Sequence, residues 1–435
     1  MLRLSVSCGL VVANQCRHTQ LSLHRPGVHF EILSNPEFLA AGTAIKDLLN
    51  ADRILIGSSP TPSGLRAAAA LADVYAGWIP RERIITTNVF SSELAKLVAN
   101  SMLAQRISSI NSIAAVCEAT GADVGEVAKA IGADPRIGSK FLQAGIGFGG
   151  SCFKKDVLSL AYLAESLRLP EVADYWRAVI SMNDFARDRF AARVVRCLNN
   201  TLVGKKLTVL GYAFKKDTND TRESPAVDII RTLLEEGPRE VAIFDPCCIP
   251  SQMKDEIGRF LGPQVLKANG GPVAVYGDVY EACEQSNALL ITTEFDEFKN
   301  AEASAPATLS PSQPSSTDPR PFRGLEPTEN ELLALHTHLL RCSADPAADS
   351  DPLARLNPMP SCSEGCLDCR LHEETGAAGY GADKEHVSKG RLDWRKIQCS
   401  MQRPHWVFDG RRVLDISAME KLGFRVESVG RQGKQ

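Results

Sequence analysis

A chain of 435 residues is long enough for two or three domains with cores of their own. A hydrophobic content of 44%, a charged content of 23% and a net charge of −3 give no electrostatic argument for a nucleic-acid or membrane partner. The 13 cysteines are spread thinly and no apolar run reaches transmembrane length, so we expect a cytoplasmic protein without a disulfide scaffold.

Residues 1–28 contain arginines and serines but no acidic residue. This composition is typical of an organellar transit peptide, and a disordered segment would explain it as well. Because no clear amphipathic period is present, we favour the second interpretation.

Between residues 29 and 89 the pattern is that of a parallel α/β sheet. Glu31–Leu39 predicts a strand that runs into a turn, Arg53–Gly57 a buried strand, and Ser63–Ala76 an alanine-rich helix. No strand followed by Gly-x-Gly-x-x-Gly occurs here. If this is a dinucleotide-binding domain, its first half, which binds the phosphates, is missing.

Residues 90–200 predict a central all-helical segment. Ser91 or Ser92 can cap a long helix, a shorter helix follows Gly121, and a second long helix begins at Pro170 and ends near residue 199. On the first helix Lys96 and the asparagine four residues later share one face. A solvated helix face is the plainer interpretation of that pair.

A glycine-rich loop, Gly147–Asp156, delivers Cys152 to the start of a helix. Backbone N–H groups and the helix dipole there stabilise a thiolate, and glycines let the backbone approach a phosphate or sugar closely. Asp156 lies one helical turn after the cysteine, so the two side chains form a plausible pair for covalent catalysis. A buried structural cysteine is about equally consistent with the loop alone.

Residues 201–299 and 391–435 predict a second α/β domain. A strand at Lys206–Gly211 is followed by a loop with Lys215 and Arg222 and then by a helix, an order that suits an anionic ligand. A surface pair of cations is the alternative. Further strands at Glu240–Pro246, Ala288–Thr293 and Trp406–Leu414 imply parallel pairing.

Residues 300–390 interrupt this domain with a low-complexity stretch that we expect to be disordered. It contains Cys362, Cys366 and Cys369, with His372 close behind, a spacing that would suit an iron–sulfur cluster or zinc. Because the surrounding segment lacks the strands that such a site needs, we favour incidental cysteines and predict no metal.

Several of these segments together resemble the UDP-glucose dehydrogenase family (UDP-glucose/GDP-mannose dehydrogenases). The motifs that carry the resemblance are Ser34–Leu39, Ser91–Leu94, Ala104–Asn111, Gly147–Asp156, Phe214–Glu223 and Phe408–Asp415. They cover roughly residues 30–299 and 391–430. Long independent motifs in one order are far more specific than a single glycine fingerprint.

The resemblance implies an α/β fold: a truncated Rossmann-like NAD-binding domain, a central long-helix segment and a C-terminal Rossmann-like UDP-binding domain. It implies NAD-dependent oxidation of the C6 alcohol of UDP-glucose to a carboxylate, giving UDP-glucuronate. Cys152 would capture the C6 aldehyde as a thiohemiacetal and then hold a thioester. Lys96 would stabilise the oxyanion, Asp156 and Glu37 would move protons and activate water, and Asn100 would position groups beside them.

The resemblance also assigns binding residues. Contacts to the UDP-sugar would come from Phe38, Leu39, Ala40, Arg136, Phe141, Leu142, Gly147, Phe148, Gly149, Phe214, Lys215 and Arg411. Contacts to NAD would come from Phe153, Lys154, Lys155 and Arg222. Cofactor and substrate are both anionic, so the lysines and arginines suit charge-assisted hydrogen bonds.

The sequence departs from the family pattern in the absent Gly-x-Gly-x-x-Gly half, in the 300–390 insert, in Ala41 where relatives carry Glu, and in Gln143 where they carry Lys. We therefore expect little or no activity from the isolated chain unless a complete partner subunit supplies NAD binding. The alternative is a non-catalytic UDP-sugar-binding subunit that joins complete dehydrogenases in homo-oligomers or mixed oligomers, hexamers in this family, through the central helices. A metal-binding protein is the weakest of three hypotheses.

Overall fold

The computed structural model describes residues 31–299 and 391–433, all of which belong to one compact unit. Its first part is a two-stranded parallel sheet of β1 (Ile54–Ser58) and β2 (Ile84–Asn88). The helix α3 (Pro62–Tyr75) begins with a Thr61 cap and packs its alanines against β1, whereas the shorter α2 (Ala44–Leu49) buries no residue. The strand expected at Glu31–Leu39 is reduced to one antiparallel bridge between Ser34 and Gly57.

The central segment consists of four helices, as predicted. They are α4 (Val89–Thr120), α5 (Val124–Gly132), α6 (Phe153–Ser166) and α7 (Pro170–Cys197). The expected cap at Ser91 or Ser92 is wrong: α4 begins directly after β2, and the extended Asn88 accepts the Ser91 N–H at 2.8 Å. A shared apolar cluster, which includes Ala104, Val157 and Val179, holds α4, α6 and α7 together.

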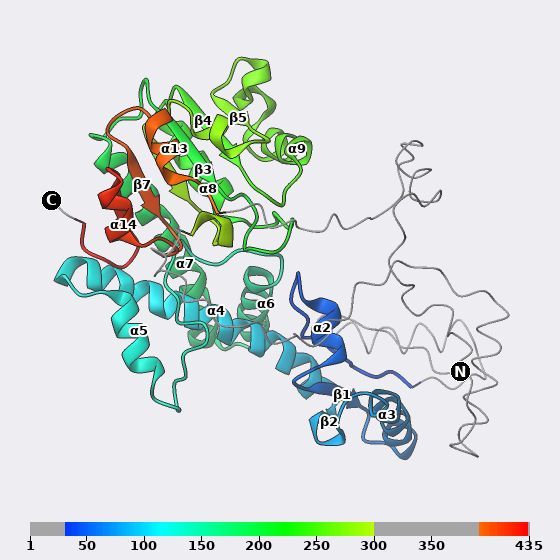
Figure 1. Cartoon of the computed structure of the whole chain (residues 1–435). Coiled ribbons are helices and arrows are strands. Elements are labelled where there is room, and N and C mark those ends of the chain that lie inside the picture. The colour runs from blue at the N-terminus through cyan, green and yellow to red at the C-terminus, as the bar shows by residue number, and fades with distance from the viewer. Residues whose placement is uncertain (1–30, 300–390, 434–435) are drawn as a thin grey trace, which may run out of the picture. The chain divides into compact units, whose positions relative to one another are not determined.

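The second sheet has six parallel strands in the order β5-β4-β3-β6-β7-β8. Four of them, β5, β4, β3 and β7, are labelled in Figure 1. The strands are β3 (Lys206–Leu210), β4 (Glu240–Phe244), β5 (Val273–Val275), β6 (Ala288–Ile291), β7 (Trp406–Asp409) and β8 (Arg425–Ser428). The chain winds outward from β3 in one direction and from β6 in the other. Ligands of such sheets bind at the carboxyl ends of the strands where the order reverses, here between β3 and β6.

Both faces of this sheet are covered. Along β6, Ala288 and Leu290 belong to a cluster with residues of α7 and α8, whereas Leu289 and Ile291 belong to the cluster on the other face, as alternation along a strand requires. The covering helices are α8 (Pro225–Glu235), α9 (Pro250–Leu261), α10 (Val279–Cys283), α13 (Trp394–Ser400) and α14 (Ile416–Lys421). Short 3-10 turns lie at Pro263–Val265, Lys267–Asn269 and Asp296–Phe298, and another precedes β2 at Arg81–Arg83.

Several expectations lie outside the described residues. They are the unmatched segment 1–28, the insert 300–390 and the cysteines at 362, 366 and 369 with His372. In the described ranges no group of three or more His, Cys, Asp or Glu side chains is placed to hold a metal ion. No described helix is both long and apolar enough to cross a membrane.

Glu240, at the amino end of β4, ties the sheet together. Its carboxylate pairs with Lys206 at 3.1 Å and Lys267 at 2.7 Å, and accepts the Tyr276 hydroxyl at 2.7 Å. Burial opposes ionisation, but these hydrogen bonds outweigh it and lower the pKa of Glu240 from 4.5 to about 2. The stabilisation is therefore complete above the unfolded pKa and is lost as the pH falls from about 4.5 towards 2.

We expect Glu240→Gln to lower the free energy of unfolding by about 2 kcal/mol near neutral pH and by much less at about pH 3. Urea denaturation at the two pH values measures both differences. Glu236→Gln, at an exposed carboxylate just after α8, is the control. An equal loss for Glu240→Gln at both pH values would contradict the linkage.

Candidate functional site

A cavity of about 430 Å³ lies where the sheet order reverses. Its lining comes from the glycine-rich loop, from the segments after β3, β6 and β7, and from α4 and the start of α6. The lining residues are Ile107, Lys140, Phe141, Gln143, Ala144, Gly147, Phe148, Gly149, Phe153, Phe214, Lys215, Glu294 and Arg411. Lys140, Lys215 and Arg411 give it a cationic lining that suits an anionic ligand.

Arg411 joins the walls of this cavity. Its Nε donates to the Thr292 carbonyl at 2.8 Å, Nη1 to the Gly147 carbonyl at 2.9 Å and Nη2 to the Phe214 carbonyl at 3.4 Å. Burial lowers the pKa of Arg411, and the nearby carboxylates of Glu294 and Asp409 oppose that shift. One buried side chain thus fixes the glycine-rich loop against the ends of β3 and β6.

The glycine-rich loop needs its glycines. Gly147 has a φ of +98°, and a Cβ there would lie 2.7 Å from Asn183 Oδ1. A Cβ on Gly149 would lie 2.4 Å from the Glu223 carbonyl oxygen. Asn183 of α7 secures the loop by accepting the Phe148 N–H at 2.8 Å and donating to the Phe148 carbonyl at 3.2 Å.

Cys152 is exposed and is the N-cap residue of α6, which begins at Phe153. The loop pattern predicts it in the first turn of the helix, one residue further on. Its carbonyl accepts the Asp156 N–H at 2.8 Å, and Ser151 Oγ lies 3.8 Å from its Sγ. A free thiol at a helix start, next to a cavity, suits a nucleophile better than a core cysteine. The alternative interpretation, a buried structural cysteine, is therefore wrong.

The other residues expected to be catalytic form two contacts along α4. Asn100 donates to Asp156 Oδ2 at 2.6 Å, and Asp156 is buried. Lys96, also buried, donates to the Glu37 carbonyl at 2.5 Å and lies 3.5 Å from Glu37 Oε1. The solvated helix face is therefore wrong for Lys96, because the chain before β1 covers it.

That covering segment contains three residues expected at the substrate. The Phe38 ring lies 5.2 Å from Lys96 Nζ, and the Leu39 N–H donates to Glu37 Oε2 at 2.8 Å. The Ala40 N–H donates to Asp47 Oδ2 at 3.0 Å. Of these three residues Phe38 faces Lys96, and none of the three lines the cavity.

Of the residues expected at NAD, Phe153 lines the cavity and the three cations cluster around the start of α6. Lys154 pairs with Glu223 at 2.8 Å and Lys155 lies 3.7 Å from Asp156. Arg222 pairs with Asp220 at 2.7 Å, and that hydrogen bond raises its pKa.

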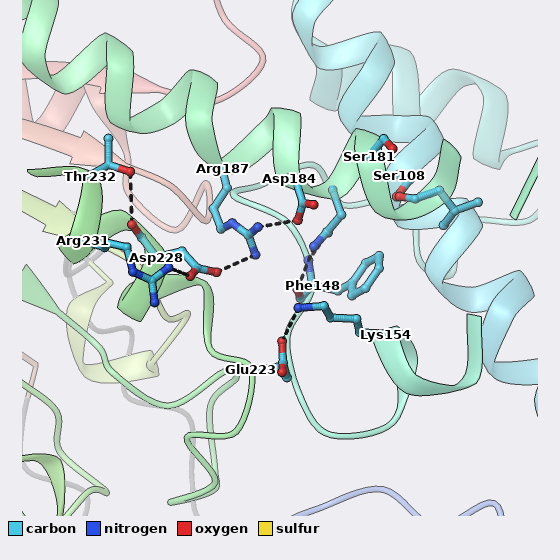
Figure 2. A network of polar contacts seen from close by, with 12 residues as sticks. Ser108, Phe148, Lys154, Ser181, Asp184, Arg187, Glu223, Asp228, Arg231 and Thr232 are labelled. Atoms are coloured by element: carbon cyan, nitrogen blue, oxygen red, sulfur yellow. Dashed lines mark hydrogen bonds and ion pairs between the residues drawn. The ribbon is translucent and has the colours of Figure 1, made fainter. Parts of the chain in front are cut away.

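Figure 2 shows Lys154 meeting Glu223 near Phe148, and Arg187 of α7 lying between Asp184 and Asp228. Asp228 belongs to α8, so these ion pairs join the central helices to the second domain around the loop. The loop is therefore held by both domains.

Two expected contacts lie elsewhere. Arg136 is exposed and pairs with Asp134 at 2.6 Å, and Leu142 packs into a core cluster with Ile110 and Val124. Conversely, Ile107, Lys140 and Glu294 line the cavity although they were not expected there, whereas Gln143 and Ala144 lie within the segment Phe141–Gly147 that the resemblance assigns to the substrate. Glu294 could have been found, because it follows the carboxyl end of a predicted parallel strand.

Comparison with known proteins agrees with this arrangement. Three models of the UDP-glucose/GDP-mannose dehydrogenase family match this chain. The model of the NAD binding domain matches residues 7–79, that of the central domain residues 90–185 and that of the UDP binding domain residues 208–322. The first match begins within the segment 1–28 that we expected to be unmatched, which corrects that expectation for residues 7–28. The third continues into the expected insert up to residue 322.

The chain is 40% identical to the UDP-glucose 6-dehydrogenase of Drosophila melanogaster over 420 residues, 97% of this chain and 69% of that protein. It is 56% identical to that of Bos taurus over 280 residues, 64% of this chain and 56% of that protein. A UDP-glucose dehydrogenase structure from Pyrobaculum islandicum superposes with a TM-score of 0.56 at 33% identity, over 65% of this chain and 60% of that one. The chain thus spans little more than half of some relatives and about two thirds of others, and it belongs to the UDP-glucose/GDP-mannose dehydrogenase family.

Proposed function

We propose that the chain binds UDP-glucose in the cavity around Arg411 and takes part in its NAD-dependent oxidation to UDP-glucuronate. The observation that carries the proposal is the meeting of an exposed cysteine, a buried lysine and an asparagine–aspartate pair around α4 and α6, next to a cationic cavity. The cavity lies within the size range of small-molecule sites.

In this proposal Cys152 Sγ attacks the aldehyde carbon of the half-oxidised sugar, and the adduct keeps a C–H bond for the second oxidation. The Lys96 ammonium faces the carbonyl-derived oxygen, where a fixed cation in a buried position stabilises negative charge. Asp156, oriented by Asn100, and Glu37 accept protons and activate the water that releases the acid. NAD, when bound, supplies the oxidant for both steps.

The described residues fit an anionic cofactor at the start of α6, where Lys154, Lys155 and Arg222 gather beside Phe153. Each is partly exposed, so its charge is accessible to an anionic group. The sequence before β1 contains no Gly-x-Gly-x-x-Gly turn, so we expect this chain by itself to have a low affinity for the pyrophosphate of NAD.

We also propose that the chain assembles through its central helices, in homo-oligomers or with complete subunits. Large apolar side chains on α4, α6 and α7 are exposed: Met102, Val116, Leu158, Tyr162, Tyr175 and Phe185. A non-catalytic UDP-sugar-binding subunit is the second candidate, favoured by the six-stranded sheet whose strand ends adjoin the cavity, whereas the described part of the NAD-binding region contributes two strands. The cytoplasm remains the proposed compartment on the composition argument.

Calorimetric titration of the purified chain with UDP-glucose and with NAD⁺, followed by an assay for NADH, tests the proposal. Binding of both ligands with NADH production supports the dehydrogenase. Binding of UDP-glucose alone favours the non-catalytic subunit, and co-purification with a complete relative would identify a mixed oligomer. No binding of UDP-glucose would overturn both candidates.

A further inference from the structure

Arg411 is followed by a second arginine whose side chain leaves the cavity in the opposite direction. Arg412 Nη2 reaches Asp123 Oδ1 at 2.7 Å, and its Nη1 donates to the Val429 carbonyl at 2.8 Å. Asp123 is the cap of α5, where its Oδ1 also accepts the Gly125 N–H at 2.6 Å. The turn that presents Arg411 to the cavity is therefore anchored on the far side to the central helices.

This turn needs an anchor. Arg412 has a φ of +57°, a left-handed conformation that is unfavourable for a residue with a Cβ and persists only when its surroundings hold it. Within the turn, the buried Asp409 accepts the N–H groups of Arg411 at 3.0 Å and Leu414 at 2.9 Å. Those bonds fix the backbone on the side of the sheet. The Arg412 side chain itself is held by the ion pair to Asp123 and by the hydrogen bond to the Val429 carbonyl.

We propose that Asp123 is a positioning residue for the UDP site: by holding Arg412, it holds Arg411 across the carbonyls of Gly147, Phe214 and Thr292. This inference rests on the proposed binding of UDP in the cavity. Both members of the pair are only about one fifth exposed, with side-chain exposures of 20% for Arg412 and 21% for Asp123. A partly buried pair on a strained turn contributes more than the usual surface ion pair.

The capping and positioning roles of Asp123 can be separated. Asparagine caps a helix as well as aspartate, so Asp123→Asn keeps the cap and removes the charge that Arg412 needs. Asp123→Glu keeps the charge and weakens the cap. We expect Asp123→Asn to raise the Kd for UDP about three- to tenfold with a small decrease in Tm, and Asp123→Glu to lower the Tm further with a smaller change in Kd.

Arg431 supplies a matched control. It lies 3.7 Å from the other carboxylate oxygen of Asp123, is more than half exposed and does not belong to the turn. Arg431→Gln should leave the Kd for UDP unchanged. Arg412→Gln should raise it at least as much as Asp123→Asn does, because it also removes the hydrogen bond to the Val429 carbonyl. The double variant Asp123→Asn/Arg412→Gln should be no worse than Arg412→Gln alone, because Asp123 acts through Arg412.

Calorimetry with UDP and thermal unfolding of all five variants decide the matter. Additive losses in the double variant, or an unchanged Kd for Asp123→Asn beside normal UDP binding by the unaltered chain, would overturn the positioning role and leave the proposed function intact. No UDP binding by the unaltered chain would overturn the proposed function, and the positioning role with it.

Discussion

Changing Cys152 to serine is expected to lower kcat for NADH formation from UDP-glucose by at least about a thousandfold. Serine keeps the size of the side chain at the start of α6, but a hydroxyl there is a far weaker nucleophile than a thiolate. Cys152 is not among the residues that line the cavity, so the Kd for UDP-glucose should change by less than about twofold. NADH absorbance and calorimetry on one preparation measure both quantities.

Cys399 is the matched control, because it is the other exposed cysteine among the described residues. Cys399→Ser should leave kcat unchanged. Alkylation with iodoacetamide gives an independent readout: UDP-glucose should protect Cys152 and not Cys399. A Cys152→Ser variant with near-normal turnover would contradict covalent catalysis at this position.

The elements that sequence predicts best are those with local signals. Pro170 and the long periodic pattern after it define α7, and Lys206–Leu210 is a fully buried strand. The short strands β5 and β8 and the small helices α10 and α14 were missed. They contain few residues each and are fixed by their neighbours in the sheet rather than by their own pattern.

The residues of the candidate site likewise fall into those that a local spacing brings together and those that only the fold brings together. Cys152 and Asp156 are four residues apart, so a helical spacing alone brings them near each other. The contact of Arg411 with the Gly147 carbonyl joins residues 264 positions apart, and only the resemblance to a family placed them at one site. The guanidinium of Arg136 is exposed and pairs with Asp134 two residues away, and its contact with the substrate stays a prediction.

Replacing Lys96 with methionine is expected to lower kcat about a hundredfold or more, with a small change in the Kd for UDP-glucose. Lys96 is buried on α4, where it donates to the Glu37 carbonyl and faces the Phe38 ring. A cation fixed in a buried position needs no reorganisation when negative charge develops on a substrate oxygen, whereas methionine fills the space without the charge. NADH formation at saturating substrate measures the loss.

Two further variants separate charge from packing. Lys96→Arg keeps the charge and should retain more activity than Lys96→Met, although the planar guanidinium does not reproduce a point charge. Lys129→Met, on the exposed side of α5, makes the same substitution away from the site and should have no effect. Equal losses for Lys96→Met and Lys96→Arg with unchanged Tm would show that the site requires the ammonium geometry. Full activity in Lys96→Met would remove Lys96 from the proposed chemistry and leave the charge on the oxygen to backbone N–H groups at the start of α6.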